Sequence, residues 1–216
     1  MAASRPLRTP DEEPPALHAR AIQDLSYIRR TMEGASSFTD VPGWGLMAIG
    51  VTAIAASFVA EQQHNAGRWI AVWLCEATLA ASIGVGMTFR KMSRRARVAG
   101  SPMLSVPARK FLFGFWPAIL AGGVLTAALI DPTALWSANS TPPRILPGVW
   151  LLLYGVGVTT AGTFSVRAVP LMGLGLIVMG AVALLVHSIS ADLLLGLAFG
   201  VWQIAFGIWI ARRHGG

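Results

Sequence analysis

Long apolar blocks alternate along the chain with short polar or charged segments. Six such blocks follow the polar residues 1–41, and none shows the period-two alternation of an outer-membrane strand. Each block is long enough to cross the ~30 Å hydrocarbon core of a bilayer as a helix. The pattern predicts an all-α, polytopic membrane helical bundle with six transmembrane helices. The predicted spans cover residues 42–60, 68–89, 110–130, 147–165, 169–187 and 191–211.

The polar N-terminal region divides into two parts. Residues 1–15 are rich in proline and charge and lack periodicity, so we expect them to be disordered. Residues 16–40 contain a predicted amphipathic helix and a linker, and the helix has an apolar stripe at helical spacing. The stripe consists of Ala21, Leu25, Ile28 and Met32. We expect this juxtamembrane helix to lie in the cytoplasm and to dock on a protein partner or on the membrane surface.

A stiff junction leads from this linker into the first span. Pro42 suits the first turn of a helix, Gly43 follows it, and Trp44 favours the membrane–water interface. For the same reason we expect Trp69 and Trp150 to lie at headgroup level. Residues 41–211 then form the membrane domain, and residues 212–216 form a short C-terminus.

Composition supports a membrane protein and narrows its class. Of 216 residues, 54% are apolar, which is too many for the surface of a soluble domain. The net charge of +7 arises beside the apolar blocks, so topology explains it better than nucleic-acid binding. The single cysteine, Cys75, excludes an intrachain disulfide and a cysteine-based metal cage. No apolar h-region precedes the first span, so we expect that span to act as the insertion signal.

The distribution of Lys and Arg predicts the orientation. With six crossings, nearly all basic residues fall on one side, and only Arg68 and Arg144 fall on the other. The positive-inside rule places both termini in the cytoplasm. Arg outnumbers Lys, and Ala and Gly are abundant, which suggests a GC-rich bacterial genome and hence a bacterial inner membrane. The densest basic run could also bind anionic lipid headgroups. This run comprises Arg90, Lys91, Arg94, Arg95 and Arg97.

Two short matches suggest an internal repeat. Aligning Pro42 and Gly43 with Pro147 and Gly148 also places Gly50 on Gly155 without a gap. Residues 113–116 and 199–202 share a Phe-Gly-x-Trp pattern in the third and sixth spans. Two three-helix halves would have opposite orientations, as in the 3+3 inverted repeats of secondary transporters. Chance matching among Gly-, Ala- and Leu-rich helices is the alternative.

Three polar residues within or beside the spans are candidates for chemistry. Glu76 stands in the second apolar block, where an ionisable group is costly unless it is paired or protonated. It acts either as a functional group or as a neutral link to a Ser, Thr or Gln of another helix. Gln203 lies near the middle of the sixth span and favours interhelical hydrogen bonding. His187, at the outer end of the fifth span, could approach Glu76.

Motifs of membrane enzymes are missing from the sequence. It contains no HExxH, GxSxG or P-loop pattern and no cluster of Asp ligands, so we expect neither catalysis nor a cofactor. His64 and His187 both face the outer side, but they lack the spacing and helix pairing that would favour haem. An enzyme or haem protein is therefore the weakest of the functional classes considered.

Residues 22–56 resemble the N-terminal signature of an uncharacterised bacterial family of small multi-spanning membrane proteins. The likeness rests on Tyr-Ile-Arg-Arg-Thr-Met-Glu-Gly-Ala-Ser-Ser-Phe-Thr-Asp-Val-Pro-Gly-Trp-Gly, beginning at Tyr27. The resemblance implies architecture and transfers no catalytic residue. Because it centres on the juxtamembrane helix and the junction, it favours an interaction role. We therefore expect a non-enzymatic sensor, regulator or accessory subunit, with a small transporter or channel that uses Glu76 as the alternative.

Overall fold

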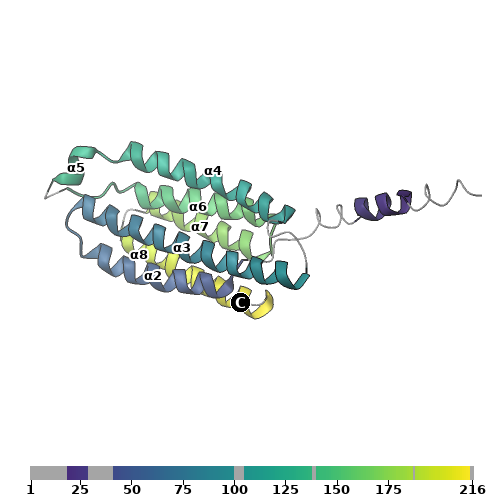
Figure 1. The fold of residues 1–216 in the computed structure, drawn as a ribbon. Coiled ribbons are helices and arrows are strands. Elements are labelled where there is room, and N and C mark those ends of the chain that lie inside the picture. The colour runs from purple at the N-terminus through teal and green to yellow at the C-terminus, as the bar shows by residue number, and fades with distance from the viewer. Residues whose placement is uncertain (1–18, 29–40, 100–104, 138–139, 187, 215–216) are drawn as a thin grey trace, which may run out of the picture. The chain divides into compact units, whose positions relative to one another are not determined.

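The computed structural model describes residues 19–28, 41–99, 105–137, 140–186 and 188–214. The chain divides into two units, Met1–Ser36 and Ser37–Gly216. In the first unit, residues 19–28 are helical, as the amphipathic pattern predicts. The second unit is an all-helical bundle (Figure 1). Its elements are α2 (Gly43–Glu61), α3 (Ala66–Ala99), α4 (Val106–Leu129), α5 (Pro132–Trp136), α6 (Leu146–Gly162), α7 (Ala168–Leu185), α8 (Ala191–Leu195), the π-helix η1 (Gly196–Trp202) and α9 (Gln203–His214).

Five helical segments are long and apolar enough to cross a membrane. They are Gly43–Glu61, Ala66–Val98, Val106–Leu129, Ala168–Leu185 and Ala191–Arg213. The last segment joins α8, η1 and α9 into one rod. The predicted fourth span corresponds to α6, an apolar helix of 17 residues.

The helices depart from the predicted spans in two places. α3 has 34 residues and continues beyond the predicted end at residue 89, so the basic run lies on a helix. At 1.5 Å per residue this helix is about 51 Å long, well beyond the ~30 Å of hydrocarbon. The connection between the third and fourth predicted spans contains the short helix α5.

Glycines at seven-residue spacing bring two pairs of helices into close contact. A Cβ atom on Gly43 would lie 2.6 Å from the carbonyl oxygen of Gly207, and one on Gly50 would lie 2.7 Å from that of Gly200. These contacts join α2 to η1 and α9. Small residues permit such backbone contact where lipid supplies no hydrophobic drive for association.

The second pair, α6 and α7, uses the same device. A Cβ atom on Gly155 would lie 2.9 Å from the carbonyl oxygen of Gly173, and one on Gly148 would lie 3.1 Å from that of Gly180. Gly155 and Gly173 therefore mark a contact between two backbones. Small residues at these positions permit the close packing of α6 and α7.

The order of packed helices runs α4, α6, α7, α9, α2, α3. α4 packs against α6, α6 against α7, and α7 against α9, while α2 lies between α9 and α3. α3 and α4 are consecutive in the chain, yet over the described residues each packs mainly on other helices. The row of helices therefore has two ends, and these ends are formed by α3 and α4.

Candidate functional site

Glu76 lies on the buried face of α3 and bonds to the neighbouring helix. Its side chain is only 8% exposed, and its Oε1 atom is hydrogen-bonded to the Thr52 hydroxyl of α2 at 2.8 Å. The same hydroxyl lies 2.9 Å from the carbonyl oxygen of Ile49, one turn earlier in α2. The structure therefore supplies a threonine partner for Glu76 in an adjacent helix.

A second carboxyl group, that of Asp192 in α8, contacts the same face of α3 and was missed by the sequence analysis. Its Oδ1 atom accepts hydrogen bonds from the Trp69 and Trp73 indole nitrogens, at 2.7 and 3.3 Å. Trp69, Trp73 and Glu76 follow one another at spacings of four and three residues, so they share one helix face. Asp192 lies in the first turn of α8, at the start of the predicted sixth span. In the sequence, an acid at this position is easily assigned to the preceding turn.

Trp69 is a core residue of the bundle, and its predicted depth at headgroup level stays a prediction. It is 2% exposed, and its ring stacks on Trp150 with centroids 5.6 Å apart and planes 7° from parallel. The Asp192 carboxylate explains this burial, because it satisfies the indole N–H that would otherwise favour the interface. Trp150 is half-buried and donates its own N–H to the hydroxyl of Thr126 at 2.8 Å.

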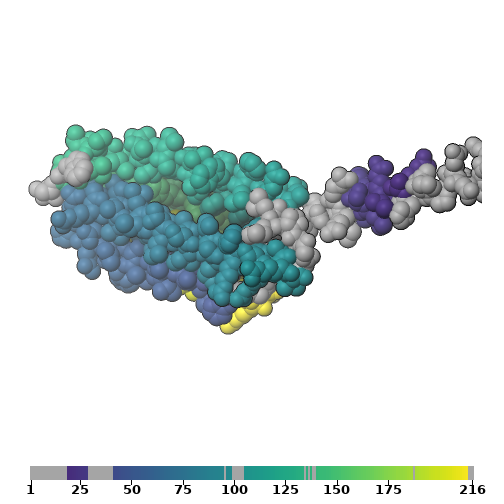
Figure 2. Space-filling view, in the orientation of Figure 1, coloured from purple at the N-terminus to yellow at the C-terminus, as the bar shows by residue number. Residues whose placement is uncertain are grey.

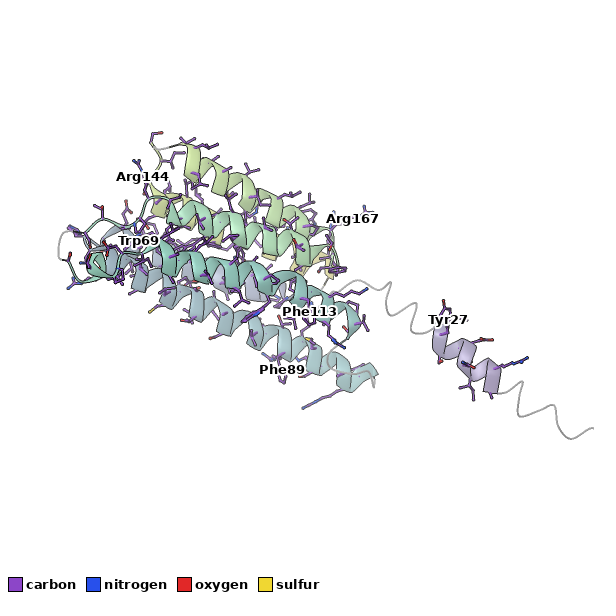
Figure 3. All side chains as sticks on the ribbon, turned by 90° about the horizontal axis from the view of Figure 1, so that it is seen from above. Tyr27, Trp69, Phe89, Phe113, Arg144 and Arg167 are labelled. Carbon is purple, nitrogen blue, oxygen red and sulfur yellow. The ribbon has the colours of Figure 1, made fainter. Side chains whose placement is uncertain are left out.

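These contacts form a tryptophan cluster, which we define as Trp69, Trp73, Trp150, Thr126 and Asp192. It joins α3, α4, α6 and α8 at one end of the bundle. In Figure 3, Trp69 and Arg144 lie near the same end. The cluster thus links α3 with α4 indirectly, through α6, at the end where the connection after α2 begins.

Gln203 is a buried polar residue, as predicted, and its partner is Tyr154 of α6. The Gln203 side chain is 1% exposed and is hydrogen-bonded to the Tyr154 hydroxyl. Its Oε1 atom has no hydrogen-bond partner among the residues that the structure describes. Turning the amide over would only exchange which of its two polar atoms is unpaired.

Two aromatic rings pack against Tyr154, one member of this polar pair. The Tyr154 ring meets Phe115 of α4 and Phe199 of η1 edge to face, with centroids 5.5 and 5.2 Å away. Gln203 follows η1 directly, and π-helical segments frequently occur at functional sites.

A space-filling view shows a recess between α3 and α4, with the more distant green helices visible inside it (Figure 2).

The junction leading into α2 combines buried and exposed residues. Pro42 precedes the helix in an extended conformation and is buried, and Gly43 contacts the backbone of α9. Trp44 is 58% exposed on the bundle surface, as an interfacial side chain would be. The Lys91 Nζ atom lies 3.4 Å from the Val41 carbonyl oxygen, so the basic end of α3 contacts this junction.

The remaining basic residues of the run are spread along the last turns of α3. Arg90, Arg94 and Arg97 are exposed, which leaves their guanidinium groups accessible. At the same end, the Lys110 ammonium group lies 5.6 Å from the Phe164 ring centroid. Binding of lipid headgroups at this run stays a prediction.

Several predicted residues lie outside the helical bundle or outside the described residues. Ala21, Leu25 and Ile28 are exposed on the helix over residues 19–28. Met32 and His187 lie outside the described residues, so an approach of His187 to Glu76 stays a prediction. His64 is exposed, and its Nδ1 atom lies 2.9 Å from the Gln62 carbonyl oxygen.

Comparisons of the chain with protein-family models, with curated proteins and with solved structures gave no match. The resemblance of residues 22–56 to a bacterial family therefore stays a prediction. The class of protein therefore follows from the length and the hydropathy of its helices. By these two properties the chain is an integral, multi-pass helical membrane protein.

Proposed function

We propose that the protein is a non-enzymatic subunit of the bacterial inner membrane, a sensor, regulator or accessory protein, that docks a protein partner through its N-terminal helix. The observation that supports this most is the separate N-terminal unit, Met1–Ser36. Within its described helix, Leu25 and Ile28 are 66% and 52% exposed. Apolar side chains at helical spacing and with this exposure are typical of a helix that binds in a groove.

A protein partner fits the helix better than a lipid surface does. Helices that lie on membranes carry a polar face rich in Lys and Arg. Here the polar side of the predicted helix mixes an acid, Asp24, and the neutral Gln23 with its arginines, which are Arg20, Arg29 and Arg30. The acid weakens attraction to anionic headgroups, whereas a protein surface can match charges of both signs.

The proposed topology has six crossings with both termini in the cytoplasm. At 17 residues, α6 is about 25 Å long, which is the short end of the range for a transmembrane helix. Arg144 and Arg167 lie at opposite ends of the bundle (Figure 3). The end with Arg167 also carries the basic ends of α3 and α9, which include Arg90, Arg94, Arg97, Arg212 and Arg213. The positive-inside rule makes this the cytoplasmic end.

Site-specific photo-crosslinking in intact cells tests the docking role. A photoreactive residue at Leu25 should form a protein adduct, and Ile28→Asp in the same chain should abolish it. The same photoreactive residue at Gln23, on the polar side, is the matched control and should give no such adduct. Adducts with lipid alone from Leu25, or equal adducts from both positions, would contradict docking on a protein.

A small secondary transporter or channel is the second candidate. In a 3+3 repeat, α2, α3 and α4 correspond to α6, α7 and the rod formed by α8, η1 and α9. α2 packs on α3 and α9, and α6 packs on the equivalent helices α7 and α4. This correspondence favours inverted halves. The contact of α7 with α9 lacks an equally packed α3–α4 counterpart among the described residues, so the halves differ at the recess.

Reconstitution tests this candidate through Glu76. If Glu76 couples or selects, Glu76→Gln should abolish flux or its pH dependence in proteoliposomes. Glu61→Gln, in the exposed end of α2, is the control and should leave both unchanged. Unaltered flux and pH dependence in Glu76→Gln would remove Glu76 from any transport mechanism.

A further inference from the structure

The hydrogen bonds around Thr52 depend on which atom carries a proton. The Thr52 hydroxyl lies within hydrogen-bond distance of two oxygens, Oε1 of Glu76 at 2.8 Å and the Ile49 carbonyl at 2.9 Å. A carbonyl oxygen and an ionised carboxylate can only accept, and a threonine hydroxyl has one proton to donate. With Glu76 ionised, the single Thr52 proton is therefore shared between two acceptors, which weakens both contacts.

A protonated Glu76 removes this competition. Its O–H then donates to the Thr52 Oγ1 atom, and the Thr52 O–H donates to the Ile49 carbonyl. Each contact then has a proton of its own, and no charge is buried. In a membrane span this matters, because an unpaired carboxylate at such depth is costly. No Lys or Arg lies between Arg68 and Arg90 on α3 or within residues 43–60 of α2 to balance a charge.

The two sides of Glu76 along this face of α3 differ in polarity. Toward the start of the helix come Trp73 and Trp69, both bonded to the Asp192 carboxylate. Toward the basic end the same face carries Ala80, Ile83 and Met87 before Lys91. A proton that moves to Glu76 from the Asp192 end therefore passes polar groups. A proton that moves to Glu76 from the basic end passes three apolar side chains.

Other titratable groups near this face are few. α2 carries none from residue 43 to 60, and α5 carries none. The contacting elements α6 and α8 contribute Tyr154, which is bonded to Gln203, and Asp192. On α3 itself, Cys75 is exposed away from the buried face. Asp192 is thus the one acid on the Glu76 face among these elements, over the residues described.

We propose that Glu76 is a proton-binding site that exchanges with the Asp192 end of the bundle, and that Trp73 gates the step between the two carboxyl groups. Trp73 lies one turn before Glu76 on the same face of α3 and bonds to Asp192 of α8, and this bond is the longer of the two at 3.3 Å. When Glu76 releases its proton, the Glu76 O–H bond breaks and the proton passes to water or to the Asp192 carboxylate. When Glu76 takes up a proton, the reverse transfer forms the O–H bond again. This site is independent of the docking role. In the proposed topology the Asp192 end is the outer side, and only that assignment rests on the proposed function.

Infrared spectroscopy of the full chain in proteoliposomes tests the proton site. At neutral pH the spectrum should contain the C=O band of an uncharged carboxylic acid, and Glu76→Gln should lose it. Glu61→Gln, the exposed control, should retain the band. Thr52→Val should shift it to higher frequency, because the carboxyl loses its hydrogen-bond partner. A neutral-pH spectrum that is the same with and without Glu76 in this region would overturn the proposal.

Hydrogen–deuterium exchange of that band tests the route. Asp192→Asn should slow the exchange severalfold, and Trp73→Phe, which removes the N–H bond, should accelerate it. Met87→Leu is the matched control on the apolar half of the same face and should leave the rate unchanged. Should Asp192→Asn not accumulate in the membrane, Trp73→Phe carries the test alone. A rate that responds to Met87→Leu but to neither of the others would place the path at the opposite end.

Discussion

The Trp69 and Trp150 rings stack face to face, 5.6 Å apart and 7° from parallel, and thereby join α3 to α6. Each indole N–H has a partner on a further element, Asp192 for Trp69 and Thr126 for Trp150. One aromatic stack thus connects four helices whose residues are far apart in the chain. Its bonds lie between side chains, so conservative substitutions can test each of them separately.

Replacing Trp150 by Phe should destabilise the bundle. The change keeps an aromatic ring but removes the N–H that binds the buried Thr126 hydroxyl, at a cost of about 1 kcal/mol. Thermal unfolding in detergent should show a lower midpoint. Trp116→Phe is the control, because Trp116 is 59% exposed on α4 and should change little. Equal midpoints for the two variants would contradict the role of this bond.

The contact of α2 with the α8–η1–α9 rod should not tolerate a side chain at Gly50. A Cβ atom there would lie 2.5 Å from Cγ1 of Ile204 and 2.7 Å from the Gly200 carbonyl oxygen. Gly50→Val should therefore destabilise the protein by about 1–3 kcal/mol, the usual cost of overpacking. Chemical denaturation in mixed micelles measures the loss. Gly123→Val is the control, since a Cβ atom at that position meets nothing within 4 Å.

Thr52 and Glu76 should be energetically coupled. A double-mutant cycle with Thr52→Val and Glu76→Gln should yield an interaction free energy of about 0.6 kcal/mol, typical of hydrogen bonds between membrane helices. Unfolding free energies of the four proteins give the value. The pair Thr78→Val and Glu76→Gln should be additive, because the Thr78 hydroxyl bonds to the Cys75 carbonyl of its own helix. Additivity of the Thr52 cycle would show that the 2.8 Å contact contributes no stability.

The proposed orientation predicts which sites a membrane-impermeant thiol reagent can reach. One substitution, Cys75→Ser, removes every thiol from the chain. On that background, Glu61→Cys should be labelled in intact cells, and Arg213→Cys should be labelled only after the membrane is opened. Both positions are exposed, so accessibility to water on each side decides the result. Labelling in the reverse order would invert the topology.

The sequence predicted the helical class and the burial of two polar residues. Each predicted span overlaps a helix, because an apolar block of that length has few other ways to satisfy its backbone in lipid. Gln203 was expected to bond to another helix and Glu76 either to do so or to act as a functional group, and both are buried. The partners themselves, Thr52 and Tyr154, depend on which helix faces meet, and the hydrophobic pattern of a membrane helix carries little information on that point.

The tryptophan cluster shows where sequence reasoning ends. Trp favours the interface when its N–H needs water, and it favours the core when a carboxylate replaces the water. Trp69 and Asp192 are 123 positions apart, so only the packed bundle reveals which case applies. The continuation of α3 to Ala99 was missed for a different reason. A run of basic residues marks the limit of the membrane but does not interrupt a helix.

The length of α3 has a mechanical consequence. A single rod of about 51 Å carries Trp69 near one end and Lys91, in contact with the junction, near the other. A tilt that starts at the Trp69 end must therefore displace the far end as well, because no flexible segment interrupts the helix to absorb it. The Glu76–Thr52 hydrogen bond lies between these two contacts, so α3 is held against α2 at this point as well.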